Sequence, residues 1–167
     1  MNNEEISKLK LILEDHEKRI KKIEEIIKKF EITPETGEKE LVGIKKLAKK
    51  VGIDEDKLKE IFDIEDKQLT VIKVVGEKEK DKTQNIALLV LLGYKYLFGK
   101  EEVLSQEIRR NVAENGIPLN NFATYLNEIT PGLIRRKGKL RSPKTTYKLT
   151  ILGESKAREL VKAISGE

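Results

Sequence analysis

The chain has 167 residues, enough for one or two small domains, and it contains no cysteine, which excludes a disulfide framework and thiolate metal sites. Its formal net charge is only +5 although 38% of the residues are charged, so the position of the charges matters more than their sum. The apolar runs are shorter than a bilayer span, and the N-terminus carries acids where a signal peptide is basic, which predicts a cytoplasmic protein with no membrane partner.

Residues 1–31 are predicted to form an amphipathic helix of the coiled-coil type, because apolar side chains recur at the a and d positions of successive heptads. We expect this stripe to pair two protomers into a homodimer, with packing on the chain's own domain as the alternative. His16, the only histidine, lacks convergent metal ligands, so we expect a passive residue of the seam rather than a metal ligand or a pH switch. The seam consists of Ile6, Leu9, Leu13, His16, Ile20, Ile23, Ile27 and Phe30.

The next segment is predicted to hold a small module between two linkers. Residues 32–40 are expected to be a linker, because Pro34 and Gly37 interrupt a charged stretch, and residues 77–82 are expected to be a second, solvated linker. Between them, residues 41–76 predict a helix-turn-helix-like module: one helix ends at Gly52, and a second begins after Asp54 and includes Leu58, Ile61 and Phe62. A strand over 67–76 follows, which either pairs with a later hairpin or closes a second small domain.

Residues 83–167 are predicted to form the main domain. Thr83 is expected to cap a central helix over the most apolar segment, NIALLVLLGYKYLF, and further helices are expected over 105–116, 119–129 and 153–164. Two short strands at 133–134 and 147–149 are expected to flank the loop RRKGKLRSPKTT. No acid lies between Ile129 and Gly153, so this hairpin is strongly cationic.

The element order of residues 83–164, together with GLIRRKGK and YKLTILGESKARELV, resembles the winged helix-turn-helix proteins, many of whose regulators end in the pattern YxLTxxGxxxAxxL. The resemblance covers about half the chain. It implies that 119–129 is a recognition helix, with Asn120, Asn121 and Thr124 directed at base edges, although the two asparagines equally suit local backbone bonds. It implies phosphate contacts from the basic loop, or wing, through Arg135, Arg136, Lys137, Lys139, Arg141 and Lys144.

Arg109 and Arg110 on the preceding helix are expected to add backbone contacts, with pairing to Glu107 or Glu114 as the alternative. The sequence contains no phosphate-binding glycine loop, no nucleophile-base pair and no HExxH, so no catalytic residue, cofactor, metal or small-molecule substrate is expected.

The sequence therefore predicts a mostly α protein with a small β component (α+β) that binds double-stranded DNA as a dimer, in transcription regulation or a related DNA transaction. A protein-binding adaptor that uses the winged helix and the coiled coil is the alternative, and RNA binding would require exposed aromatic rings for stacking. The Lys- and Glu-rich composition favours a thermophilic source, although the asparagine content weakens that inference.

Overall fold

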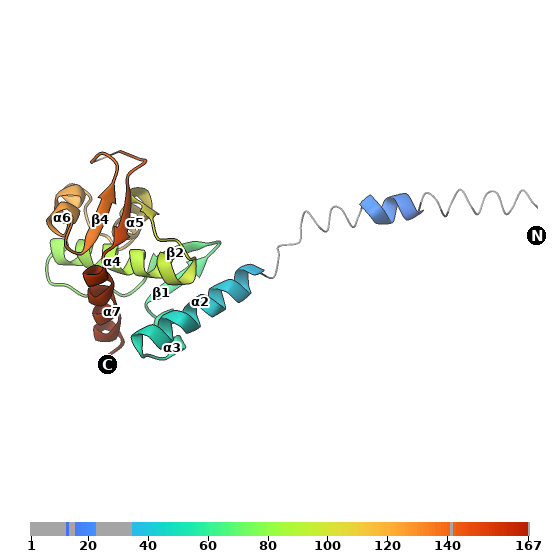
Figure 1. The fold of residues 1–167 in the computed structure, drawn as a ribbon, viewed down its shortest axis with the longest axis horizontal. Coiled ribbons are helices and arrows are strands. Elements are labelled where there is room, and N and C mark those ends of the chain that lie inside the picture. Colours follow the sequence, from blue (N-terminus) through green and yellow to red (C-terminus); the bar gives the residue numbers. More distant parts are fainter. Residues whose placement is uncertain (1–12, 14–15, 23–34, 141, 167) are drawn as a thin grey trace, which may run out of the picture. The chain divides into compact units, whose positions relative to one another are not determined.

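The computed structural model describes residues 13, 16–22, 35–140 and 142–166 (Figure 1). The chain divides into two compact units, Met1–Gly37 and Glu38–Glu167. In the first unit, residues 13 and 16–22 are helical, and Leu13, His16 and Ile20 are exposed. The other predicted seam residues, Ile6, Leu9, Ile23, Ile27 and Phe30, lie outside the described residues, so the coiled coil stays a prediction.

The remaining elements combine helices with two antiparallel sheets, which confirms the α+β class. Strands β1 and β2 form one sheet, and the other has the order β3-β5-β4. In chain order the elements are α2 (Glu35–Val51), α3 (Glu55–Lys59), β1 (Phe62–Glu65), β2 (Gln68–Val71), α4 (Glu79–Leu97), β3 (Val103–Leu104), α5 (Ser105–Glu114), α6 (Phe122–Glu128), β4 (Ile134–Lys137), β5 (Thr146–Leu149) and α7 (Ile151–Ser165).

Helix α4 is the central helix, as the sequence predicts, and it is buried on almost every side from Ile86 to Leu92. It begins at Glu79, so the predicted linker over 77–82 is wrong from that residue on. Thr83 is buried inside the helix, where its Oγ1 donates to the Glu79 carbonyl at 2.7 Å instead of capping the helix start. The charged residues before Thr83 extend the helix because Glu and Lys favour it and acids in a first turn are stabilised by its dipole.

Helix α2 likewise begins earlier than expected, at Glu35, so the predicted linker over 32–40 is wrong for residues 35–40. A single glycine costs a helix only about 1 kcal/mol, and the Glu and Lys residues around Gly37 offset that cost. Farther along α2, Gly43 packs against the end of α4, where an added Cβ would lie 2.7 Å from Leu97 Cα. This contact brings α2 against the central helix.

The predicted second helix of the middle module is wrong beyond Lys59. From Phe62 the chain forms β1, which turns back at Asp66 and Lys67 into β2. Both turn residues have positive φ, 49° and 63°, as a two-residue hairpin turn with the twist of a β-ribbon requires. The predicted strand at 67–76 is therefore shorter, 68–71, and it pairs with β1 rather than with the later hairpin.

The β1–β2 hairpin packs on the main domain, so the segments predicted as separate domains share one core. An added Cβ on Gly93 of α4 would lie 2.5 Å from Leu69 Cδ2, which places β2 directly on the central helix. The open edge of β2 is closed by side chains of α5. Asn111, fully buried, accepts from the Val71 amide at 2.8 Å and donates to the Leu69 carbonyl at 3.0 Å.

Replacing Asn111 by Ala is expected to lower the free energy of unfolding by about 2–3 kcal/mol, because the buried Val71 amide loses its acceptor. Urea denaturation measures this loss, and amide exchange at Val71 locates it in the hairpin. Gln106→Ala, at an exposed position of the same helix, is the matched control and should cost less than about 0.5 kcal/mol. Equal effects of the two substitutions would show that Asn111 does not anchor β2.

The start of α7 is fixed against the base of the β4–β5 hairpin. Thr150 caps the helix by accepting from the Gly153 amide at 3.0 Å, and its hydroxyl lies 2.7 Å from the Gly132 carbonyl and 3.1 Å from that of Leu133. The Thr150 amide donates to the same Leu133 oxygen at 3.0 Å. An added Cβ on Gly153 would lie 1.8 Å from that oxygen, so only glycine fits here.

Candidate nucleic-acid interface

The three-stranded sheet has one buried face and one cationic face. In the β4–β5 register, Arg135 lies opposite Lys148, and Lys137 lies opposite Thr146. Because side chains directly opposite each other share a face, these residues project together, while Ile134 and Tyr147 face the core. Arg135, Lys137 and Lys148 are all exposed. Arg135 and Lys137 are two of the predicted phosphate contacts, whereas Lys148 was not among them.

Glu102, just before β3, neutralises part of this face. Its carboxylate lies 3.3 Å from Lys137 Nζ and accepts from Thr146 Oγ1 at 3.1 Å. The hydrogen bond from Lys137 is the largest cause that lowers the pKa of Glu102. The hydrogen bond from Thr146 and the nearby charge of Lys148 lower it further. Lys137 is thus ion-paired, whereas Arg135 and Lys148 form no ion pair with any described acid. Among the described residues Arg135 is therefore unpaired, and Lys148 is close enough to Glu102 to lower its pKa without forming an ion pair with it.

The wing projects beyond α5 and α6 (Figure 1). Gly138 begins its tip with a φ of 104°, a conformation that favours glycine. Buried Thr145 then donates its hydroxyl to the Lys139 carbonyl, and the Ser142 amide donates to the same oxygen at 3.1 Å. These bonds close the loop while the side chains of Lys139 and Lys144 stay exposed. Arg141, another of the predicted phosphate contacts, lies outside the described residues.

Helix α6 begins at Phe122, three residues later than the predicted start at Leu119. The Phe122 amide donates to the Leu119 carbonyl, so the preceding residues form a turn that contains Asn120 and Asn121. Asn121 makes no side-chain cap bond, and its Nδ2 lies 3.3 Å from the Tyr125 hydroxyl oxygen. Thr124 is the one predicted base-reading residue on the helix itself, and it is exposed. Asn120 is exposed at the helix entrance.

The side chain of Arg136 points toward α6. Its Nη1 donates to Asn127 Oδ1 at 3.2 Å, which joins the base of the wing to an exposed residue of α6. Burial raises the pKa of the neighbouring Tyr147, and the charge of Arg136 opposes that rise. Sequence reasoning did not single out Asn127. Arg136 therefore links β4 to α6 through one exposed hydrogen bond.

The two arginines of α5 have different surroundings. Arg110 donates to Glu114 at 2.9 Å, to the Leu69 carbonyl at 2.9 Å and to Thr70. The structure therefore contains the ion pair with Glu114 that was the alternative expected for this residue. Its network also includes Glu107, which accepts from Tyr94, and burial raises the pKa of Tyr94 to about 12. Arg109 instead lies with its guanidinium carbon 5.0 Å from the centre of the Phe122 ring, and no described acid pairs with it.

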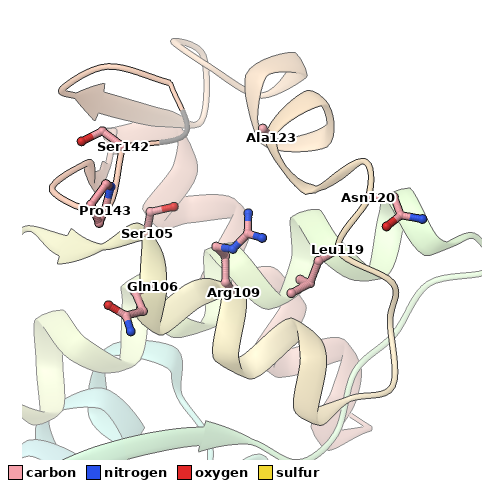
Figure 2. A pocket seen from close by; sticks show the side chains of 8 residues that line it. All are labelled: Ser105, Gln106, Arg109, Leu119, Asn120, Ala123, Ser142 and Pro143. Carbon is pink, nitrogen blue, oxygen red and sulfur yellow. The ribbon is translucent and has the colours of Figure 1, made fainter.

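Arg109 stands in a cleft of ≈ 600 Å³ between α5, the entrance to α6 and the wing. Figure 2 shows its guanidinium rising between Ser105, Ser142 and Pro143 on one side and Leu119, Asn120 and Ala123 on the other. Gln106 completes the lining, and none of these residues is acidic. The cleft connects the predicted base-reading residues to the predicted phosphate-binding wing. Sequence reasoning placed residues on both sides of it but did not predict the cavity.

Comparison with models of protein families found no match, and no similar protein was found among curated proteins or solved structures. Within the described part of the chain, no helix is both long and apolar enough to cross a membrane. The same residues contain no cluster of His, Asp or Glu arranged to hold a metal ion. The assignment of function therefore depends on the charge and geometry of this surface.

Proposed function

We propose that the chain binds double-stranded DNA through a winged helix-turn-helix domain formed by residues 79–165. The order α4, β3, α5, α6, β4, β5, α7 supports this proposal, because the resemblance stated above implies three helices, a β-hairpin and a further helix. In it, α6 is the recognition helix and the β4–β5 loop is the wing. The short length of α6 limits base reading to Thr124, Asn127 and the two asparagines at its entrance.

The observation that carries the proposal is the placement of Arg135 directly opposite Lys148. Like charges opposite each other in a sheet destabilise it by roughly 0.2–1 kcal/mol, and no described acid pairs with either one. Such a pair is advantageous when both cations bind a polyanion. Lys139 and Lys144 at the wing tip are exposed, and Arg109 stands in the cleft beside α6, so these three cations are also available to a polyanion.

Binding should weaken steeply as the salt concentration rises. If Arg109, Arg135, Lys139, Lys144 and Lys148 each neutralise one phosphate, the logarithm of the affinity should fall with that of the salt concentration with a slope of about −4.5. Fluorescence anisotropy of a labelled random-sequence duplex at several salt concentrations measures this slope. A slope near zero, or no binding at low salt, would contradict the proposal.

The same titration distinguishes DNA binding from the alternative function, that of an adaptor that binds proteins. A pair of apolar side chains at the start of α7 favours that alternative, since Ile151 is 89% and Leu152 is 68% exposed. An adaptor would leave duplex affinity weak and almost independent of salt. Dimerisation through residues 1–31 belongs to the DNA-binding proposal, because two copies would present two wings to paired half-sites.

A further inference from the structure

The cleft around Arg109 has the chemistry of an anion-binding site. Among the described residues that line it, five are polar, namely Ser105, Gln106, Arg109, Asn120 and Ser142, and none is acidic. The Ser142 hydroxyl oxygen lies 3.3 Å from the Lys144 amide, which donates to it, so the hydroxyl proton is free to be donated elsewhere. One cation among neutral donors favours a ligand with a compact negative charge.

The N–H donors of Arg109 are oriented by a neighbouring ring, as the binding of such a ligand requires. Its guanidinium lies over the Phe122 ring, which restricts the plane of its donors without occupying them. The adjacent Arg110 provides the contrast, because carboxylates and a carbonyl already accept from its two terminal nitrogens, Nη1 and Nη2. A fork of free, oriented N–H groups matches the oxygens of a phosphate group, which two parallel hydrogen bonds can hold.

The size of the cleft indicates more than a single phosphate group. Its volume of ≈ 600 Å³ lies within the usual range for sites that bind small organic molecules, roughly 300–1,000 Å³. Leu119, Ala123 and Pro143 provide apolar surface for the rest of such a molecule. Because Ser142 and Pro143 belong to the wing, an occupant would also lie between the wing and the entrance to α6.

We propose that this cleft binds a phosphorylated small molecule of about nucleotide size, and that the bound molecule competes with duplex DNA. The second half of this inference depends on the proposed function, whereas the first does not. A backbone phosphate of DNA would be recognised by the same groups, so the experiment must separate a free ligand from the duplex. A molecule in the cleft would block the path between α6 and the wing and so regulate DNA binding.

Calorimetric titration of the full chain, without DNA and at constant ionic strength, tests the site. The probes are inorganic phosphate, adenosine 5′-monophosphate and adenosine. We expect the two phosphate-bearing probes to bind and adenosine not to bind. Arg109→Gln should weaken adenosine monophosphate binding about tenfold or more, because it removes charged hydrogen bonds. Lys156→Gln, an equal change of charge on the exposed side of α7, should leave the affinity unchanged.

Three results would overturn the site. The first is that neither phosphate-bearing probe binds, the second is that adenosine binds as tightly as adenosine monophosphate, and the third is that Arg109→Gln and Lys156→Gln lose the same affinity for adenosine monophosphate.

Displacement of a labelled duplex by adenosine monophosphate then tests the competition. Displacement from the wild-type chain that Arg109→Gln reduces would support it, and binding of the nucleotide without displacement would refute it. If the chain binds the nucleotide but no duplex, the proposed function is refuted and the anion-binding site is supported. If it binds the duplex but no nucleotide, the proposed function is supported and the site is refuted.

Discussion

Replacing Arg135 and Lys148 together by Glu is expected to weaken duplex binding about a hundredfold or more. The two side chains are opposite each other on the exposed face of the sheet, and neither is paired with a described acid. The double variant removes two phosphate contacts and places two carboxylates against the duplex. Anisotropy titrations should also show the salt slope reduced by about 2.

A second pair of variants separates lost binding from lost folding. Arg135→Gln with Lys148→Gln removes the cross-strand repulsion, so the variant should be at least as stable as the wild type while it binds the duplex more weakly. Lys156→Glu with Lys162→Glu makes the same change of net charge on exposed positions of α7. If that control weakens binding as much as Arg135→Glu with Lys148→Glu, net charge rather than the wing governs affinity.

Gly153→Ala is expected to lower the free energy of unfolding by about 3 kcal/mol or more. The new Cβ would lie 1.8 Å from the Leu133 carbonyl oxygen, far inside contact distance. That oxygen cannot easily retreat, because the Thr150 amide donates to it at 3.0 Å. The helix start and the hairpin base must therefore separate. Thermal unfolding followed by circular dichroism should show a Tm lowered by roughly 10 °C.

Gly132→Ala is the matched control for this substitution. It adds the same methyl group at the same corner, but its nearest neighbour would be the Ile129 carbonyl oxygen at 4.0 Å, an ordinary contact. The change in unfolding free energy should stay within about 0.5 kcal/mol. A stable Gly153→Ala protein would mean that the contact between α7 and the hairpin is looser than described.

The residues that match the pattern YxLTxxGxxxAxxL are fold determinants, whereas Lys148, which lies between them, is not part of the pattern. Tyr147, Ala157 and Leu160 are buried, Thr150 caps α7, and Gly153 permits the close approach to Leu133. This explains why the pattern predicted the elements at the C-terminal end well: each residue has a local steric or capping task. These five residues predict nothing about a ligand, because none of them belongs to the cationic face.

Features that depend on local sequence were predictable, and those that depend on distant partners were not. The cationic wing follows from an unbroken run of one sign, and the burial of α4 follows from its apolar composition. The β1–β2 hairpin was missed because its turn lacks the usual Asn-Gly or Asp-Gly signal. Its open edge is satisfied by Asn111, 40 residues beyond Val71.

Arg109 and Arg110 show the same limit at the level of single residues. They are consecutive on one helix, and sequence reasoning gave both the same two possible roles. Their side chains leave α5 in different directions, and Arg110 reaches Thr70 and the Leu69 carbonyl, whereas Arg109 reaches the Phe122 ring. The position of the β1–β2 hairpin decides between them, and no pattern within α5 encodes that position.

The attachment of the β1–β2 hairpin to α5 also sets a lower limit on the length of a fragment that can fold. A shortened chain starting at α4 would lack Leu47, Leu58 and Leu69, which are all almost completely buried in the shared core. Part of α4 would then face water, and the Val71 partner of Asn111 would be gone. Such a fragment should aggregate when expressed, so the shortest fragment used to test duplex binding must retain α2, α3 and both strands of the hairpin.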